Sequence, residues 1–431
     1  MDRIYLMRIL ILGSGAREHA LAWKLSTEIG SKNIFIAPGN GGTEKCGQNV
    51  EIGLTDFEKL KDFCVSQKIT ILLPGSEEAI ASGIRDEFEA DDRTKSIFVF
   101  SPDKFAGQLE SSKAFAKEFM AAHKIPTAGY KSFTSINLEE GYDFLEQLKP
   151  PYVLKADGLA AGKGVLILNN LEEAKNNLKE MLVDAKFGDA SATVVIEEFL
   201  DGIEYSVFAL TDGVNYILLP EAKDYKRIGE GDTGLNTGGM GAVSPVPFFK
   251  GLLKEKTVKE VVEPTIKGLA KSSLNYRGFV FFGLIAVNNS PYVIEYNVRM
   301  GDPETEVVIP RLNESLSDIL AEAKSGRMMT REANMTNSYC TTVFAVSEGY
   351  PEAYEKGQVI TLNSLEETLF HAGTTNSGNK LLTNGGRVLA ATQFGDTMDE
   401  ALKKSYSLIE KISFKGKTFR TDIGKDLEKY I

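Results

Sequence analysis

The segment EYNVRMGDPE, residues 295–304, carries the side chains of this chain that are best suited to chemistry. Apolar runs predict two strands here, joined by a tight Asn-Asn-Ser turn. Glu295 and Asn297 are two residues apart on the second strand, so both side chains point to one face. A carboxylate and an amide oxygen suit a hard cation such as Mg²⁺. Arg299 continues that face and would bring a positive charge for an anionic substrate group. The alternative interpretation is a sheet edge with solvated polar residues.

Two glycine-rich segments are candidates for holding phosphates. GSGAREH, residues 13–19, follows an expected strand and opens a helix, but Glu18 takes the place of the third glycine of a dinucleotide motif. We therefore predict no NAD site, although the amides at the helix start could bind a phosphate. KADGLAAGKGV, residues 155–165, departs from a P-loop and predicts a lid that closes over ATP phosphates with Lys163. An ordinary exposed hairpin is the alternative.

Two further segments fit a nucleotide and a reacting carboxylate. The strand that ends near Glu197 runs into an acidic, apolar linker whose backbone could meet an adenine edge, with Glu204 close enough to accept from ribose hydroxyls. Solvated acids are the simpler interpretation of that linker taken alone. Residues 223–241 combine three cations, several carboxylates and many glycines. Such a long loop is uncommon in a compact domain, and its glycines would let backbone amides approach an anion.

The composition is that of an ordinary globular chain of 431 residues, long enough for roughly two to four domains. A formal net charge of −11 argues against non-specific binding to nucleic acid or anionic membranes. Three scattered cysteines and three scattered histidines favour neither a disulfide framework nor a histidine-based metal centre. The sequence shows no secretory signal and no apolar run that would span a membrane, so we expect a cytoplasmic protein.

The elements that position these residues follow from the hydrophobic pattern. Strands and helices alternate over residues 7–100, which predicts a parallel sheet covered on both faces. A single helix is expected at 77–89 within this region, and another at 104–123 follows it. Residues 126–200 are typical of a small α/β unit. Residues 201–310 favour antiparallel strands interrupted by a long polar loop at 221–247, and residues 339–431 form a last unit.

Together these motifs resemble the ATP-grasp superfamily, and within it the phosphoribosylamine–glycine ligase family. The resemblance extends from Met7 to the end of the chain. Its most distinctive strings are GSGAREHALAWK (13–24), APGNGGT (37–43), KADGLAAGKGV (155–165), DTGLNTGGMGA (232–242), RMGDPE (299–304), HAGT (371–374) and TNGGRVL (383–389). It implies an α/β protein with an N-terminal parallel-sheet (pre-ATP-grasp) domain at 1–103, an ATP-grasp domain at 104–330 with a mobile lid subdomain at about 126–200, and a small α+β C-terminal domain at 331–431.

The resemblance also implies a role for each matching residue. Catalysis and glycine binding would involve Arg299, Asp302 and Asp224. ATP would contact Lys113, Lys155, Gly162, Lys163, Gly164, Glu197, Glu198, Leu200 and Glu204. The metal ligands would be Glu295 and Asn297. The N-terminal loops, through Gly15, Arg17, Gly39, Asn40 and Glu77, would receive phosphoribosylamine, and the C-terminal domain would close the site from the other side.

The implied reaction is ATP-dependent ligation of glycine to 5-phosphoribosylamine in purine biosynthesis, with ATP and Mg²⁺ (or Mn²⁺) as cofactors. Small molecules would be the only partners of a monomeric enzyme. Another ATP-grasp carboxylate–amine ligase with a different acceptor, and a non-catalytic nucleotide-binding module, are the alternatives. The chain departs from the family pattern at four positions, namely Ser76, Tyr225, Leu235 and Glu306.

Overall fold

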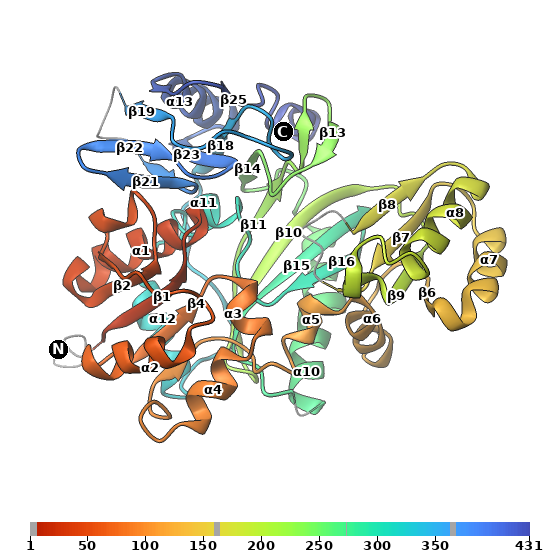
Figure 1. The fold of residues 1–431 in the computed structure, drawn as a ribbon, viewed down its shortest axis with the longest axis horizontal. Helices are drawn as coiled ribbons and strands as arrows, with labels where there is room; N and C mark the ends of the chain where they lie inside the picture. The colour runs from red at the N-terminus through yellow and green to blue at the C-terminus, as the bar shows by residue number, and fades with distance from the viewer. Residues whose placement is uncertain (1–6, 159–163, 273, 363–367) are drawn as a thin grey trace.

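The computed structural model describes residues 7–158, 164–272, 274–362 and 368–431. The N-terminal and C-terminal parts lie one above the other on one side of a set of long central strands, and a smaller four-stranded unit projects from the opposite side (Figure 1). This arrangement confirms the predicted architecture of an N-terminal parallel sheet, a central domain with a separate subdomain, and a C-terminal domain.

The N-terminal part is a five-stranded parallel sheet, because buried apolar strands alternate with helices that cover both faces. In sheet order its strands are β3 (Gln48–Asn49), β2 (Ile34–Pro38), β1 (Ile9–Gly13), β4 (Ile71–Pro74) and β5 (Phe98–Val99). Its helical segments are α1 (Ala16–Ile29), η2 (Ser31–Asn33), η3 (Thr43–Lys45), α2 (Phe57–Ser66), α3 (Glu77–Ala81) and α4 (Ile84–Ala90). The single helix predicted at 77–89 was wrong, since Gly83 adopts φ 90° and separates α3 from α4.

The helix predicted at 104–123 is also divided. It forms α5 (Gln108–Ser111) and α6 (Lys113–Ala122), with Ser112 in an extended conformation between them. The Ser112 hydroxyl accepts from Phe115 N and donates to Asp157, whose Oδ1 also accepts from Ala114 N at 2.7 Å. Serine and aspartate are strong N-caps, so α6 begins afresh at this point. Asp157, which takes the place of a P-loop glycine, therefore caps a helix.

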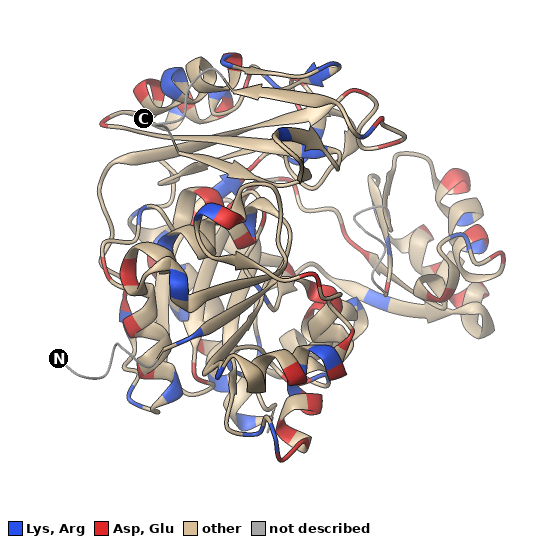
Figure 2. Ribbon diagram, turned by 60° about the vertical axis from the view of Figure 1, so that its left-hand side comes forward, with Lys and Arg blue, Asp and Glu red and all other residues tan. Residues whose placement is uncertain are grey.

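The projecting unit is an antiparallel four-stranded sheet with its own core. Its strands, in sheet order, are β6 (Tyr130–Thr134), β9 (Thr193–Glu197), β7 (Tyr152–Ala156) and β8 (Val165–Leu168). Its helical segments are η4 (Ser135–Asn137), α7 (Leu138–Gln147), α8 (Leu171–Leu182) and η5 (Gly188–Ser191). A separate cluster that includes Phe133, Leu178 and Ile196 is buried within this unit. Figure 2 shows the unit standing apart from the rest of the molecule.

One large sheet runs through the central and C-terminal parts. In sheet order its path is β16 (Ser290–Asn297), β15 (Gly278–Val287), β10 (Ile203–Thr211), β11 (Tyr216–Asp224), β14 (Gly241–Ser244), β18 (Tyr339–Ser347), β23 (Arg387–Gly395) and β20 (Leu369–His371). Two short strands, β17 (Arg331–Glu332) and β25 (Lys417–Thr418), pair with β11 and β18. Because β14 pairs with both β11 and β18, the two parts share one sheet.

The predicted polar loop at 221–247 contains more regular structure than expected. β11 extends to Asp224, and a two-stranded ribbon of β12 (Arg227–Gly229) and β13 (Thr233–Asn236) precedes β14. The remaining strands, β19 (Val359–Leu362), β21 (Thr374–Ser377), β22 (Lys380–Thr383) and β24 (Ile412–Ser413), form a small C-terminal sheet. The remaining helical segments are α9 (Leu252–Lys256), η6 (Thr257–Val262), α10 (Glu263–Lys271), α11 (Thr305–Val308), α12 (Leu316–Lys324), α13 (Met398–Glu410) and η7 (Lys425–Tyr430).

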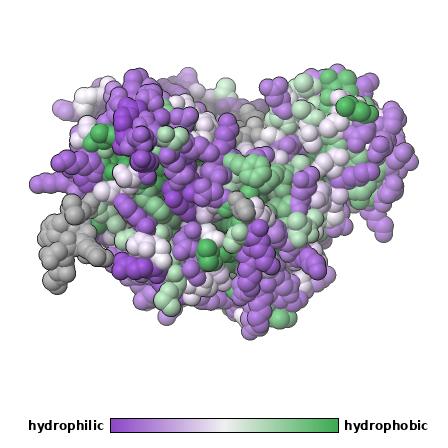
Figure 3. Space-filling view, turned by 90° about the horizontal axis from the view of Figure 1, so that it is seen from below, coloured by the Kyte–Doolittle hydropathy of each residue, from purple (hydrophilic) through white to green (hydrophobic). Residues whose placement is uncertain are grey.

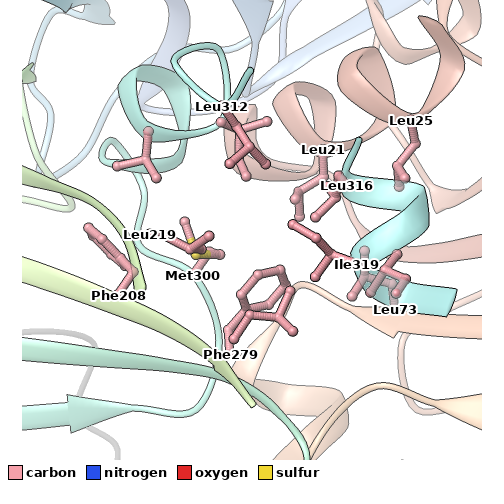
Figure 4. Packing of buried hydrophobic residues seen from close by; sticks show 14 of the residues in the cluster. Leu21, Leu25, Leu73, Phe208, Leu219, Phe279, Met300, Leu312, Leu316 and Ile319 are labelled. Carbon is pink, nitrogen blue, oxygen red and sulfur yellow. The ribbon is translucent and has the colours of Figure 1, made fainter. Parts of the chain in front are cut away.

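The largest core cluster joins the N-terminal part to the central sheet. Leu21 and Leu25 of α1 face Leu316 and Ile319 of α12, with Phe279 of β15 beyond them (Figure 4). This shared burial fixes the N-terminal loops relative to the large sheet, since dense apolar packing resists displacement. On the face shown in Figure 3, hydrophobic residues form groups among hydrophilic ones. Among the described helices, none has the length and apolar character that a membrane crossing requires.

Candidate active site

A buried lysine–carboxylate cluster lies where the four-stranded unit joins the central part. Lys155 of β7 places Nζ 3.0 Å from Glu197 Oε2, at the end of β9. Lys117 of α6 places Nζ 3.2 Å from the same oxygen. Lys113, one helical turn before Lys117, directs Nζ towards the carbonyl oxygen of Gly158 at 3.3 Å. The lysines therefore converge beside the glycine-rich hairpin, where an anionic ligand would find positive charge.

Burial lowers the pKa of Lys113 below its ordinary value, although the nearby Glu295 carboxylate opposes that shift. Two of the hairpin residues predicted to contact ATP, Gly162 and Lys163, lie outside the described residues. Gly164 is described, and its carbonyl oxygen accepts from Ala156 N at 2.8 Å. The hairpin base is thus held against β7.

A group of oxygen ligands lies next to these lysines. Lys226 Nζ is 3.4 Å from Glu204 Oε2 and 3.8 Å from Glu295 Oε1. Asp224, at the end of β11, interacts electrostatically with the same three side chains, and burial raises its pKa. Burial opposes ionisation of Glu295, but Lys226 and the other cations outweigh it and lower the pKa of Glu295.

The Lys226 ammonium group therefore supplies positive charge among these carboxylates. A hard divalent ion prefers such an all-oxygen donor set. Glu295 and Asn297, the predicted metal ligands, lie on β16 two residues apart, where they pair with Gly283 and Phe281 of β15. Their residue types suit Mg²⁺, although no group of three or more His, Cys, Asp or Glu side chains among the described residues is arranged to hold a metal ion.

Arg299 lies just beyond β16 and connects the site to the N-terminal part. Its Nη2 is 2.7 Å from Glu110 Oε1 of α5, and its Nε is 3.3 Å from Glu77 Oε2 of α3. Its Nη1 donates to the carbonyl oxygen of Met300 at 3.1 Å. These partners orient the guanidinium group near the Glu295 carboxylate of β16, because they contact its different nitrogens.

A cavity of about 290 Å³ lies between the N-terminal and C-terminal parts. This volume is close to the lower end of the range for small-molecule sites. The lining residues are Ser14, Gly15, Gly39, Asn40, Asp302, Tyr350, Ala372, Gly373, Thr374, Asn384, Gly385 and Arg387. Gly15 must lack a side chain here, since a Cβ atom would lie 2.9 Å from Asp302 Oδ2. The cavity therefore brings together loops from all three parts of the chain.

Asn40 ties two walls of this cavity together. Its Nδ2 donates to the carbonyl oxygens of Ser14 at 2.9 Å and His371 at 2.7 Å. Its Oδ1 accepts from the amides of Gly42 and Thr43. These bonds use the polar atoms of Asn40 within the protein, so this side chain shapes the cavity.

Asp302 and Arg387 form the polar floor of the cavity. Arg387 Nη1 is 2.9 Å from Asp302 Oδ1, and it donates to the carbonyl oxygens of Asp302 at 2.8 Å and Gly238 at 2.9 Å. The guanidinium carbon lies 4.8 Å from the ring centre of Phe344. Arg387, from the C-terminal part, therefore holds the glycine-rich loop against the segment that carries Asp302.

The start of α1 is occupied by carboxylates of the protein. Gly15 N donates to Glu18 Oε2 at 2.7 Å, and Arg17 N donates to Asp302 Oδ2 at 3.3 Å. The guanidinium group of Arg17 contacts Glu18 Oε1 at 2.6 Å and the carbonyl oxygen of Met300 at 3.2 Å. A phosphate at these two amides, which the sequence suggested, would have to displace the carboxylates. Glu18 takes the place of the third glycine because it caps the helix.

The predicted residues thus fall into two groups. Lys113, Lys155, Glu197, Glu204, Asp224 and Glu295 surround the hairpin and the end of the large sheet, whereas Gly15, Gly39, Asn40 and Asp302 line the cavity. Arg17 and Glu77 are not among the lining residues. Glu198 turns its Oε1 to Gly129 N, at 2.8 Å. The sequence assigned no site role to Lys117, Glu110 or Arg387, and it counted Lys226 only as one of the cations of the 223–241 segment. The TNGGRVL string contains Arg387 but did not indicate what it contacts.

Two departures from the family pattern have local explanations. The Tyr225 hydroxyl donates to Asp426 Oδ1 of η7 at 2.6 Å, which directs it towards the C-terminal segment. Ser76 caps α3 and accepts from Glu78 N at 3.3 Å. Leu235 is half exposed on β13. Glu306 is the departure with a larger consequence.

Replacing Glu306 by glutamine should stabilise the protein increasingly as the pH rises. The side chain is fully buried in α11, and no donor among the described residues makes a hydrogen bond to either carboxyl oxygen. Burial, with the neighbouring Asp302 carboxylate, raises the pKa of Glu306 well above its usual range. The folded state therefore retains a proton that the unfolded state loses above pH about 4.3, and the stability contribution declines as the pH rises. The difference should grow by up to about 1.4 kcal/mol per pH unit.

The measurement is the unfolding midpoint of Glu306→Gln and of the unaltered chain between pH 5 and pH 8, values that fall above the unfolded-state pKa. Glu172→Gln provides the control, because Glu172 is an exposed carboxylate in the first turn of α8. Parallel midpoint curves for Glu306→Gln and the unaltered chain would show that Glu306 is ionised in the folded protein.

Comparison with known proteins assigns the family. The phosphoribosylglycinamide synthetase N domain matches residues 7–110, its ATP-grasp (A) domain matches 111–305, and its C domain matches 340–426. The chain belongs to the phosphoribosylglycinamide synthetase family. The phosphoribosylamine–glycine ligase of Chlorobaculum tepidum is 44% identical over 427 residues, which cover 97% of this chain and 99% of that protein.

Other relatives of this synthetase family are consistent with that assignment. A bifunctional purine biosynthetic protein of Pichia angusta is 44% identical over 426 residues, and this chain spans 97% of its own length but 53% of that protein. The crystal structure of phosphoribosylamine–glycine ligase from Thermotoga maritima superposes with a TM-score of 0.84 at 38% identity, covering 96% of this chain and 100% of that one. The synthetase domains follow the same order as the three parts of the fold.

Proposed function

We propose that this protein joins glycine to 5-phosphoribosylamine at the expense of ATP, giving glycinamide ribonucleotide, ADP and phosphate in purine biosynthesis. The observation that carries the proposal is the full-length match to proteins named phosphoribosylamine–glycine ligase, together with a cavity built from both the N-terminal and C-terminal parts. The ATP-grasp domain alone would fit other ligases, whereas the cavity supplies a place for a specific acceptor.

The chemistry proceeds in two balanced steps. A carboxylate oxygen of glycine attacks the γ-phosphorus of ATP, the bond to the β,γ-bridging oxygen breaks, and ADP leaves with that electron pair. The amine of phosphoribosylamine then attacks the carbonyl carbon of glycyl phosphate, inorganic phosphate leaves, and the new amide nitrogen loses a proton. Carboxylates acylate amines poorly, so phosphorylation supplies the leaving group. Positioning and charge stabilisation are the protein's main tasks.

The residues divide these tasks by position. Lys113 and Lys155 would contact the ATP phosphates, with the hairpin that contains Gly162, Lys163 and Gly164 above them. Glu197, Glu198 and Leu200 would surround adenine, and Glu204 the ribose. The support for this placement is the convergence of Lys113, Lys155 and Glu197 at one buried point.

Glycine and the acyl phosphate would lie between Asp224, Arg299 and Asp302. Arg299 is held by carboxylates on both sides, so its guanidinium group is oriented before substrate arrives. Phosphoribosylamine would enter the cavity between Gly15, Gly39 and Asn40 on one wall and the C-terminal loops on the other. Glu77 would act through Arg299, and Arg17 would act through Asp302.

Glu295 and Asn297 would hold Mg²⁺, which neutralises phosphate charge when bound, and Mn²⁺ prefers similar oxygen ligands. The all-oxygen surroundings of Lys226 support this assignment. The expected partners are small molecules, since the net charge of −11 disfavours nucleic acid. We further propose that the enzyme acts as a monomer, which light scattering would test.

The experiment measures ADP release with ATP, Mg²⁺, glycine and phosphoribosylamine formed in situ from ribose 5-phosphate and ammonia, omitting each component in turn. Turnover that requires both glycine and the sugar phosphate supports the proposal. Release of ADP with glycine alone would indicate a ligase with another amine acceptor. No release in any combination would indicate a nucleotide-binding module.

A further inference from the structure

The carboxylate of Glu197 has one fully engaged oxygen and one free oxygen. Its Oε2 is 3.0 Å from Lys155 Nζ and 3.2 Å from Lys117 Nζ. Its Oε1 is buried and has no hydrogen-bond partner within the described structure. The side chain is only 5% exposed, so an unpaired acceptor at this position is costly unless a ligand supplies a donor. The free oxygen therefore indicates a hydrogen-bond donor on the ligand.

The two lysines are anchored differently. Lys117 Nζ donates to Thr127 Oγ1 at 2.8 Å and lies 3.5 Å from the carbonyl oxygen of Ala128, besides its contact with Glu197. The ammonium group of Lys117 also lies 5.3 Å from the ring centre of Tyr130. These partners belong to the segment that joins α6 to β6 and to β6 itself, so Lys117 has no route towards the phosphates while they hold it.

Lys155 is held by fewer contacts than Lys117. Among the described side chains, the ammonium group of Lys155 has Glu197 as its one hydrogen-bond partner, and its neighbours Lys113 and Glu295 belong to the phosphate and metal region. When ATP binds, Lys155 would turn to the phosphates, as proposed above. Lys117 then becomes the remaining cation on Glu197. Lys117 thus keeps Glu197 Oε2 in place, and Oε1 stays free to accept from the ligand.

We infer that Lys117 is a specificity-determining residue, which holds Glu197 by its Oε2 so that its free oxygen selects a 6-amino purine nucleotide over a 6-oxo purine nucleotide. The inference rests on the proposed function, because it takes Glu197 to meet the base of ATP. An ionised carboxylate only accepts hydrogen bonds. The amino group of adenine donates to it, whereas the 6-oxo group of hypoxanthine is an acceptor and would leave two buried acceptors face to face.

The charge balance at Lys117 supports this role. Burial lowers the pKa of Lys117 to about 8, and the Glu197 carboxylate is the main influence that opposes the shift. The lysine therefore carries its charge at neutral pH through its contact with Glu197. Glu197 and Lys117 come from different elements, β9 and α6, so their contact also fixes the base region of the four-stranded unit against the helix.

The test compares the Kd values of Mg-ADP and Mg-IDP by titration calorimetry. These ligands differ only at the base, and binding needs neither glycine nor the amine. Lys117→Met keeps an unbranched side chain that is one atom shorter and removes the charge. We expect the preference for ADP over IDP to fall by about tenfold or more. Because binding is measured separately from ligation, an enzyme that binds ADP selectively but releases no ADP in the full assay would refute the proposed function alone.

Lys113→Met is the matched control, since Lys113 lies one turn away on α6 and would contact the phosphates that both nucleotides share. It should weaken ADP and IDP by the same factor. If Lys117→Met also weakens both ligands equally, Lys117 is a phosphate ligand and the inference is overturned. An unchanged ADP:IDP ratio would overturn it as well.

A second variant keeps the test decisive if Lys117→Met does not fold. Glu197→Gln replaces one carboxylate oxygen by an amide group that can donate to a 6-oxo purine. The ADP preference should shrink or reverse in this variant. An unchanged ratio in Glu197→Gln would refute the inference by itself. If both variants fold, their effects on the ratio should be less than additive, because they remove one shared interaction.

Discussion

Replacing Arg299 by alanine is expected to lower kcat about 10²- to 10³-fold, with little change in the Kd of ATP. Arg299 is oriented by Glu77 and Glu110 and lies just beyond β16, which carries Glu295. In the proposed mechanism, a charge held there would stabilise the acyl-phosphate step, where negative charge develops, more than it would stabilise bound ATP. The measurement is kcat from saturating ADP release, together with the Kd of Mg-ATP by calorimetry.

Arg277→Ala provides the matched control. Arg277 also links the central part to the N-terminal part, through Glu89 Oε1 at 2.7 Å and the carbonyl oxygen of Val99 at 2.7 Å. It belongs to no part of the proposed site, so its loss should lower stability and leave kcat unchanged. Arg299→Lys should restore part of the turnover, since it returns the charge without the fork. Equal losses of turnover and ATP affinity in Arg299→Ala would remove the role assigned to Arg299.

The sequence predicted the N-terminal fold well because its signals are local. β1, β2 and β4 are short apolar runs between helices, and such runs bury themselves on both faces of a parallel sheet. The sequence predicted two helices as continuous and did not predict the break within each. Gly83 and Ser112 each interrupt a continuous helical pattern, and the reason for the break at Ser112 is a tertiary contact to Asp157. Propensity alone cannot show such a contact.

Long-range pairing explains what else the sequence left open. β14 pairs with β18 almost a hundred positions later, so the shared sheet has no local signature. Glu295, Asn297 and Arg299 could be placed together because one strand and its continuation carry them. Arg387 contacts Asp302 from 85 residues away, and no pattern within either segment indicates that pair. Their residue types were evident, but their partners required the fold.

Arg17 shows that the type of a residue does not by itself predict which groups its side chain contacts. The sequence placed Arg17 on a loop for the sugar phosphate, which is a reasonable use of a cation. The structure directs its guanidinium group to Glu18 and to the carbonyl oxygen of Met300. The carboxylate of Glu18, the next residue in the same helix, thus forms an ion pair with the guanidinium group of Arg17. Arg387, which the sequence did not single out, is the arginine that lines the cavity.

Replacing Arg387 by methionine should therefore raise the KM for phosphoribosylamine about tenfold to a hundredfold, at an unchanged Kd of ATP. Hydrogen bonds to charged groups contribute about 1.5–3 kcal/mol each, which corresponds to this range. Arg387 holds Asp302 and the carbonyl oxygen of Gly238 in place at the cavity floor. Methionine can keep the packing on Phe344 but cannot make these bonds. The measurement is initial-rate ADP release against the concentration of amine formed in situ.

Arg420→Met is the control that distinguishes weaker acceptor binding from weaker docking of the C-terminal part. Arg420 also joins that part to the glycine-rich segment, through Asp232 Oδ1 at 2.8 Å and the carbonyl oxygen of Arg227 at 3.0 Å, yet it does not line the cavity. If the KM rises in Arg387→Met and not in Arg420→Met, the effect belongs to the cavity floor. If both variants raise the KM equally, the C-terminal part acts through its docking as a whole. In that case Arg387 has no separate role in acceptor binding. The groups that bind the acceptor would then be the backbone amides of the loops around the cavity.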